Sequence, residues 1–226
     1  MSELTKYEEG RLIIPVGYLG NVDDEETAVI IEDFVTQEHL EDLYEYAIAA
    51  DMTYDGGPGG SLKDRVHESY KFKENNLNLF QTIKETYALP IQTMLEEKHG
   101  VELTGSKCTE LHKPSSDSLQ GKVNYLVTSS RCGCKSEVSP FIVAWTEGTS
   151  QKEHTDNGND FTAIMYLNEN YEGGELNFPT LDISIKPKKG SLIIWPGYLT
   201  HSISEISSGT RYTMPIFLKA ISDITN

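Results

Sequence analysis

The chain has 226 residues, of which 38% are hydrophobic, and its 19 basic and 35 acidic residues give a formal net charge of −16. This length can bury a sizeable core, and we expect residues 1–226 to form one domain. The acidic charge disfavours a sequence-independent grip on nucleic-acid phosphates and suits a soluble protein that attracts basic substrates. No stretch approaches a membrane span and no apolar signal region opens the chain, so we expect a cytoplasmic protein.

The first hundred residues are predicted to supply a strand and supporting helices. Residues 1–27 are polar except for the apolar patch Leu12–Val16. This composition predicts that the segment is either a mobile arm or an outer strand. Ala28–Phe34 is rich in β-branched and apolar residues and is predicted to be a strand.

Two helices follow this strand. Thr36 is suited to cap a helix whose apolar stripe has helical spacing: Leu40, Leu43, Tyr44, Ala47 and Ile48. A second, longer helix is predicted from Asn76, with Pro90 kinking or splitting it.

Two features of the middle of the chain leave alternatives open. The Gly-Gly-Pro-Gly-Gly segment at 56–60 is either a connector or a lid over an active site. Four potential zinc ligands occur in an insertion near 105–137: Cys108, His112, Cys132 and Cys134. Their spacing fits no standard finger, and three unpaired thiols are ordinary in an intracellular protein, so the zinc site stays an open alternative.

From Val123 onward the pattern changes to short apolar runs separated by Gly, Pro and Asn. The predicted strands are Val123–Thr128, Pro140–Trp145, Phe161–Leu167, Leu176–Phe178, Leu181–Ile185 and Ser191–Trp195. Such a pattern is typical of an antiparallel sandwich or barrel. Ser202–Ile206 and Thr210–Leu218 flank a Ser-Ser-Gly turn and are predicted to form a hairpin, which would bring Arg211 alongside His201.

Three side chains in this region have the chemistry of a ferrous iron site. His154 and Asp156 share a face if their segment is extended, and His201 supplies a distant third ligand. Two imidazoles and one carboxylate form a facial triad that leaves coordination positions open for a co-substrate and O2. The plainer alternative for His154 and Asp156 alone is a surface pair.

Arg211 points to the co-substrate. A buried arginine needs a carboxylate partner, and its planar fork suits a bidentate one. Thr213, two residues further along the same strand, faces the same way and could add a hydroxyl donor.

Together these residues resemble the 2-oxoglutarate- and Fe(II)-dependent dioxygenases, in particular their prolyl 4-hydroxylase branch. The matching motifs are His154-Thr155-Asp156, Tyr166-Leu167-Asn168, Glu172-Gly173-Gly174-Glu175, Phe178-Pro179, Pro187-Lys188-Lys189-Gly190, His201 and Arg211. The resemblance implies a mostly β fold, a double-stranded β-helix of the jelly-roll or cupin-like type at 104–220, with the N-terminal helices on its larger sheet. It also implies that Tyr166 and Arg211 bind the distal carboxylate of 2-oxoglutarate.

The implied reaction is hydroxylation of a prolyl residue in a peptide or protein, with oxidative decarboxylation of 2-oxoglutarate to succinate and CO2. Fe(II) and 2-oxoglutarate are the expected cofactors, and ascorbate is a candidate third. Two departures leave the substrate open. Arg211 stands where collagen-type relatives usually have lysine, and Trp145 stands where the family often has tyrosine.

Other functions remain alternatives at this stage. The same scaffold could act on a free amino acid, another small molecule or a nucleic-acid base, although the acidic charge counts against the last. A non-catalytic, cupin-like binding barrel is a further alternative, but it has no evident need for Arg211. Asp156 argues against a halogenase, which usually lacks that carboxylate. The sequence leaves the oligomeric state open.

Overall fold

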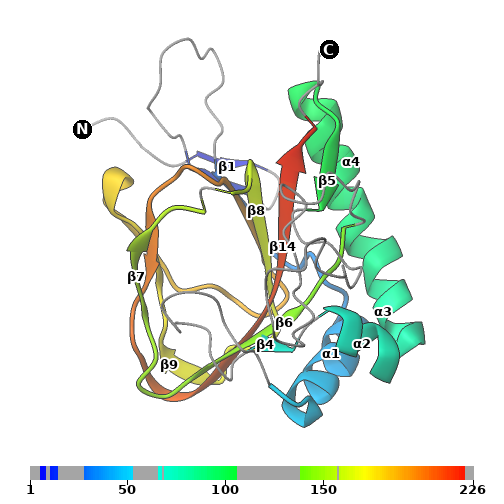
Figure 1. Ribbon diagram of the computed structural model, residues 1–226. Coiled ribbons are helices and arrows are strands. Elements are labelled where there is room, and N and C mark those ends of the chain that lie inside the picture. Colours follow the sequence, from blue (N-terminus) through cyan, green and yellow to red (C-terminus); the bar gives the residue numbers. More distant parts are fainter. Residues whose placement is uncertain are drawn as a thin grey trace, which may run out of the picture.

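The computed structural model describes residues 6–8, 11–14, 28–52, 66–67, 69–105, 138–156 and 158–221. In this part of the chain, helices gather on one side of a curled antiparallel barrel (Figure 1). Some predictions fall outside the described residues and stay predictions: the lid at 56–60, the strand Val123–Thr128, and the zinc site of Cys108, His112, Cys132 and Cys134. Among the described residues, no helix is both long enough and apolar enough to cross a membrane.

The larger sheet is built around one long strand near the C-terminus. Its order is β1 (Lys6–Glu8), β2 (Arg11–Ile14), β3 (Ala28–Ile31), β12 (Leu192–Pro196), β8 (Phe161–Tyr166), β14 (Ile206–Ala220), β6 (Ile142–Thr146) and β4 (Val66–His67). Two more strands, β5 (Leu103–Gly105) and β9 (Tyr171–Gly173), also pair with β14. All these pairings are antiparallel, so each strand can present one face to the interior.

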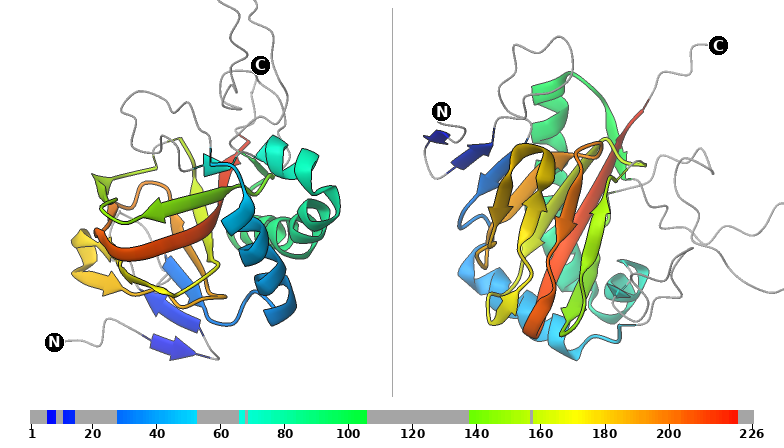
Figure 2. Two further views of the ribbon diagram at one scale, coloured as in Figure 1. Left: turned by 90° about the horizontal axis from the view of Figure 1, so that it is seen from below. Right: turned by 90° about the vertical axis from the view of Figure 1, so that its left-hand side faces the viewer.

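The smaller sheet has the order β11 (Ile183–Ile185), β10 (Leu176–Phe178), β13 (His201–Ile203) and β7 (Gln151–His154). The two sheets curl round a common interior as the predicted double-stranded β-helix (Figure 2). The predicted strand at Leu181–Ile185 is shorter than expected. Its start belongs to the 3-10 turn η2 (Pro179–Leu181), and Asp182 has a φ of 55°, so the extended segment begins only at Ile183.

The first helix, α1 (Gln37–Ala49), begins as predicted after Thr36, whose side chain accepts a hydrogen bond from the backbone N–H of His39 at 3.4 Å. The predicted stripe buries Leu40, Leu43 and Ala47. Ile48 does not join them, because it lies on the solvent side with 55% of its surface exposed.

The second helical region is interrupted before Pro90. It consists of α2 (Ser69–Asn75), α3 (Leu77–Ile83), the π-helical turn η1 (Lys84–Ala88) and α4 (Leu89–His99). Asn76 caps α3 by accepting a hydrogen bond from Leu79 N at 3.2 Å. Proline has no N–H to continue the α-helical ladder, and the wider π turn takes up this break.

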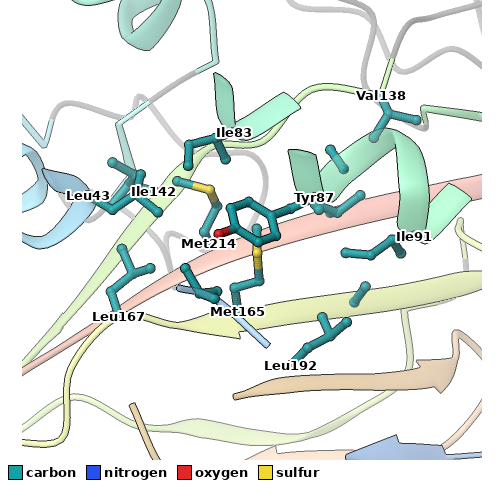
Figure 3. Packing of buried hydrophobic residues seen from close by; sticks show 14 of the residues in the cluster. Leu43, Ile83, Tyr87, Ile91, Val138, Ile142, Met165, Leu167, Leu192 and Met214 are labelled. Atoms are coloured by element: carbon teal, nitrogen blue, oxygen red, sulfur yellow. The ribbon is translucent and has the colours of Figure 1, made fainter. Parts of the chain in front are cut away.

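The helices cover the outer face of the larger sheet. Their buried side chains form one apolar cluster with residues of β8, β12 and β14, as the labelled residues in Figure 3 show: Leu43, Ile83, Ile91, Met165, Leu192 and Met214. A second cluster, which includes Tyr166, Phe178 and Trp195, joins strands of both sheets. The second cluster thus lies inside the barrel, where Trp195 contacts the predicted metal ligand His201.

The predicted hairpin between Ser202 and Leu218 is wrong. β13 pairs with β7 and β10 in the smaller sheet, whereas β14 pairs with β6 and β8 in the larger one. The chain crosses between the sheets at Ser204 and Glu205, and the predicted Ser-Ser-Gly turn lies within β14 itself. A Cβ on Gly209 would lie 2.8 Å from Asn170 O, so this glycine allows β9 to approach closely instead of turning the chain.

Candidate active site

The three predicted metal ligands meet at one edge of the smaller sheet. His154 ends β7 and His201 begins β13, and the two residues pair directly across the antiparallel strands. His154 Nε2 lies 3.7 Å from Asp156 Oδ1, and His201 Nε2 lies 3.6 Å from Asp156 Oδ2. Among the residues that the structure describes, these three form the one group whose ligand atoms all lie within 4.8 Å of one another.

Both imidazoles are oriented by backbone carbonyls. His154 Nδ1 lies 2.9 Å from Lys152 O, and His201 Nδ1 lies 2.9 Å from Leu199 O. When Nδ1 carries the proton and donates to the carbonyl, Nε2 is left with the lone pair that a metal needs. The donor set therefore fits a divalent metal: two Nε2 atoms and one carboxylate converge on one point.

Asp156 reaches this point by a route that strand alternation did not predict. It lies beyond the end of β7, where its backbone N–H donates to Gly197 O at 2.7 Å. The buried hydroxyl of Thr162 on β8 donates to Asp156 Oδ2 at 2.6 Å. A loop contact and a hydroxyl from the other sheet thus hold the carboxylate.

The centre is buried on the His201 side and open on the other. The His201 side chain is 5% exposed and lies beside the ring of Trp195, with centroids 4.9 Å apart, whereas the His154 side chain is 31% exposed. Burial lowers the pKa of His201, against the opposing effect of the Asp156 charge, and so favours the neutral imidazole. A neutral, lone-pair-bearing imidazole is the form that binds metal.

Gly197 is expected to be intolerant of any side chain. A Cβ at this position would lie 2.0 Å from Asn159 O and 3.0 Å from Asp156 O, both rigid backbone atoms. We therefore expect Gly197→Ala to lower the free energy of unfolding by about 1–3 kcal/mol, the usual cost of overpacking. Gly158→Ala is the matched control, because nothing lies within 4 Å of its Cβ position. Chemical denaturation of both variants measures the difference, and equal stabilities would contradict the tight loop described here.

The second part of the site is built around Arg211. Arg211 is 1% exposed, and its Nη1 donates to Gly174 O at 2.7 Å. Its guanidinium carbon lies 5.3 Å from the centroid of the Trp145 ring and 5.7 Å from that of Tyr166. Within the described part of the chain, Nε has no hydrogen-bond partner and no carboxylate forms an ion pair with the guanidinium. Burial lowers the pKa of Arg211, against the opposing effects of Tyr166, Tyr171 and the Glu175 charge, and is costly for a guanidinium with no directly bonded carboxylate.

Tyr166 and Thr213, the other two residues predicted to bind the co-substrate, lie on neighbouring strands. They face each other across β8 and β14, and both are buried. Burial raises the pKa of Tyr166, so its hydroxyl stays protonated, and this hydroxyl has no partner among the described residues. Asn168, from the same motif, has a structural part, since its amide bridges to Thr210 O and Tyr212 N on β14 at 2.8 Å each.

Three residues of the site were not singled out from the sequence: Thr162, Tyr171 and Trp195. Thr162 orients Asp156, and Tyr171 on β9 buries a second hydroxyl that lacks a partner among the described residues. No sequence pattern marks either residue, because the significance of each depends on a neighbour from a different strand. Trp195 lines the site beside His201. The sequence predicted this residue only as the end of the strand Ser191–Trp195.

Comparison with known proteins agrees with this geometry. Residues 141–219 match the family model of the 2OG-Fe(II) oxygenase superfamily, an interval that contains the triad, Tyr166 and Arg211. Two PKHD-type hydroxylases from strains of Prochlorococcus marinus are 36% identical to this chain over 76 and 75 residues, which is 29% of this chain and 34% of each relative. The chain thus spans about a third of the length of the curated relatives it matches.

Solved structures extend the likeness to most of the fold. The viral collagen prolyl hydroxylase of Paramecium Bursaria Chlorella virus-1, solved as a 2OG complex, matches with a TM-score of 0.52 at 17% identity, covering 89% of this chain and 100% of its own. A truncated form of the same protein gives the same TM-score at 15% identity. These matches confirm the double-stranded β-helix. With the family match, they confirm the resemblance to the prolyl 4-hydroxylase-like 2-oxoglutarate and Fe(II) oxygenases.

Proposed function

We propose that this protein is a 2-oxoglutarate- and Fe(II)-dependent dioxygenase that hydroxylates a prolyl residue of a peptide or protein. One observation carries the proposal: a convergent His-Asp-His centre shares a barrel with a buried arginine that has no carboxylate partner among the described residues. A dicarboxylate that chelates the metal at one end and meets the arginine at the other explains both features. A barrel that binds only a metal explains the first alone.

The proposed metal ligands are His154 and His201 through Nε2 and Asp156 through its carboxylate. Fe(II) bound there would supply the activation of O2 that accompanies decarboxylation of 2-oxoglutarate to succinate and CO2. The chain's own contribution is to keep coordination positions open. It also fixes the imidazoles through Lys152 O and Leu199 O.

The proposed co-substrate anchor consists of Arg211, Tyr166 and Thr213. The hydrogen bond from Arg211 Nη1 to Gly174 O fixes the guanidinium, while Nε remains available to a ligand. A buried guanidinium and a protonated phenol make strong, charge-assisted hydrogen bonds to a carboxylate. The surrounding rings of Trp145 and Tyr166 exclude water and strengthen this attraction.

The prolyl substrate is supported by the solved relative, which is named a collagen prolyl hydroxylase, and by the prolyl 4-hydroxylase-like motifs. The net charge of −16 suits a basic peptide and disfavours nucleic acid. Ascorbate is proposed as an accessory cofactor. The cytoplasmic location and the single-domain organisation expected from the sequence stay predictions.

Coupled product analysis tests this function. The Fe(II)-loaded protein is incubated with 2-oxoglutarate and, separately, with proline-containing peptides, free amino acids or a methylated oligonucleotide. Succinate and the oxygenated substrate are then measured by mass spectrometry. We expect metal-dependent succinate formation that a basic proline-containing peptide stimulates, with one oxygen atom added to that peptide. Stimulation by a free amino acid alone would replace the peptide assignment, and no metal-dependent succinate under any condition would refute the oxygenase.

Thr162 provides a finer test of the metal site. Thr162→Val keeps the shape of the side chain but removes the donor to Asp156 Oδ2, so the carboxylate is less well held. Loss of such an outer-shell hydrogen bond typically lowers metal affinity by about 10–100-fold. We expect this loss in a calorimetric Mn(II) titration of Thr162→Val, and near-normal affinity in Thr162→Ser, which retains the hydroxyl. Unchanged affinity in the valine variant would contradict the role of Thr162 in holding Asp156 for the metal.

A further inference from the structure

Tyr171 lies in the candidate site, but no function has yet been assigned to its buried hydroxyl. Resting on the proposed function, we propose that Tyr171 is a further co-substrate-binding residue, whose phenol hydroxyl joins Arg211 and Tyr166 as a third group of donors for the distal carboxylate of 2-oxoglutarate. Three features of Tyr171 support this role: its hydroxyl lacks a hydrogen-bond partner among the described residues, its ring lies beside Arg211, and the Lys186 cation holds that ring.

The hydroxyl of Tyr171 is buried and makes no hydrogen bond to the described residues. The residue is 4% exposed, and its OH atom has no hydrogen-bond partner among the described residues. Leaving such a group unsatisfied costs about 1–3 kcal/mol. Burial raises the pKa of Tyr171 to about 12, against the opposing effect of Arg211, so the hydroxyl remains a donor at neutral pH. Phenylalanine would fill the same space without this cost.

The ring of Tyr171 lies beside the arginine. β9 pairs with β14, with Tyr171 opposite Gly209, two residues before Arg211. A Cβ built on Gly174 would lie 3.2 Å from Tyr171 Cε2 and 3.6 Å from Arg211 Cδ, so both side chains border the same point. Gly174 also accepts the hydrogen bond from Arg211 Nη1. The tyrosine and the guanidinium therefore share one neighbourhood, fixed by the Gly-Gly turn.

Lys186, which directly follows β11 of the smaller sheet, holds the ring of Tyr171 in place. Its Nζ lies 4.0 Å from the centroid of the Tyr171 ring and donates to the backbone carbonyls of Tyr171, at 3.2 Å, and Gly173. A cation over the ring face and hydrogen bonds to the same short strand restrict the motion of the tyrosine. Such preorganisation lowers the entropy lost when a ligand is bound.

The unsatisfied polar groups of this neighbourhood have one feature in common. Tyr166 OH, Tyr171 OH and Arg211 Nε are all donors, and each is buried without a partner in the described part of the chain. A carboxylate is acceptor-only and offers about four lone-pair sites, so it can serve all three donors at once. The free end of a dicarboxylate that already chelates the metal meets this requirement.

The test separates this role from simple packing by using two ligands. Calorimetric titrations of the Mn(II)-loaded full chain compare 2-oxoglutarate with 2-oxobutyrate, which keeps the 2-oxo acid end and lacks the distal carboxylate. Loss of one hydrogen bond to a charged group implies that Tyr171→Phe binds 2-oxoglutarate about tenfold more weakly. The affinities of this variant for 2-oxobutyrate and for Mn(II) should match those of the wild type. Tyr46→Phe is the control, since Tyr46 stacks on Phe72 among the helices, and it should bind both ligands normally.

The possible outcomes are distinct. Wild-type affinity of Tyr171→Phe for 2-oxoglutarate would overturn this inference and leave the proposed function intact. An equal loss for both ligands would also overturn it, because the ring would then act only through packing. Failure of the wild-type protein itself to bind 2-oxoglutarate would refute the proposed function and the role of Tyr171 with it.

Discussion

Replacing His201 with alanine should abolish 2-oxoglutarate turnover and leave the protein folded. His201 contributes one of three convergent ligands and pairs directly with a second, His154, across the strands. Two ligands without the third cannot hold the metal in its facial geometry. We therefore expect metal affinity to fall by more than the about 10–100-fold that accompanies loss of an outer-shell partner. Mn(II) titration and succinate formation measure the two effects, and circular dichroism verifies the fold.

A matched control distinguishes this loss from a general effect of removing histidine. His99, exposed at the end of α4, is remote from the triad in sequence and should tolerate alanine with full turnover and metal affinity. Turnover retained in His201→Ala would contradict the metal centre itself. Turnover lost in both variants would show that the assay reports stability instead of chemistry.

Arg211→Ala should weaken 2-oxoglutarate binding strongly while leaving metal affinity almost unchanged, because Arg211 is not a ligand. Truncating one partner of a buried, hydrogen-bonded charge pair costs about 2–5 kcal/mol, or about 30- to 5,000-fold in affinity. Arg211→Lys should be intermediate, since lysine keeps the charge and loses the bidentate fork. The measurements are the 2-oxoglutarate dependence of succinate formation and a separate Mn(II) titration.

The unliganded protein provides an independent check on Arg211. Methionine has a similar length and no charge, so Arg211→Met removes a buried guanidinium that has no carboxylate partner among the described residues. An unpaired buried charge is costly to desolvate, and an apolar side chain of similar volume avoids that cost. This variant should therefore lose 2-oxoglutarate binding without a lower melting temperature. Normal 2-oxoglutarate affinity in either the alanine or the methionine variant would show that the carboxylate lies elsewhere.

Several features of the fold could be predicted because their causes are local. Thr36 and Asn76 cap helices through their own side chains, and Pro90 interrupts a helix because it lacks an N–H. The convergence of His154, Asp156 and His201 could also be predicted from the sequence, since their residue types and order carry the resemblance; their roles and that of Arg211 stay predictions. A role that depends on residue type and position along the chain can therefore be predicted from the sequence alone.

Other features depend on contacts between strands that are distant in the sequence, so no sequence pattern predicts them. Gly209, in its Ser-Ser-Gly setting, has the composition of a hairpin turn, yet its φ of 80° serves the close approach of β9. The placement of Asp156 depends on Gly197 and Thr162, which come from two other segments. Tyr171 is likewise informative only once its hydroxyl is known to lack a partner among the described residues. In each case the decisive neighbour lies far away in sequence.

The position of β14 also has a consequence for how the chain reaches its fold. This strand pairs with β5, β6, β8 and β9, and all four precede it in the sequence. During synthesis on the ribosome, β6 and β8 must therefore wait, each with one edge unpaired, until residues 206–220 emerge. Contacts of such long sequence separation fold slowly, and unpaired edges can join other chains meanwhile. Early binding of a chaperone to the nascent chain would shield these edges.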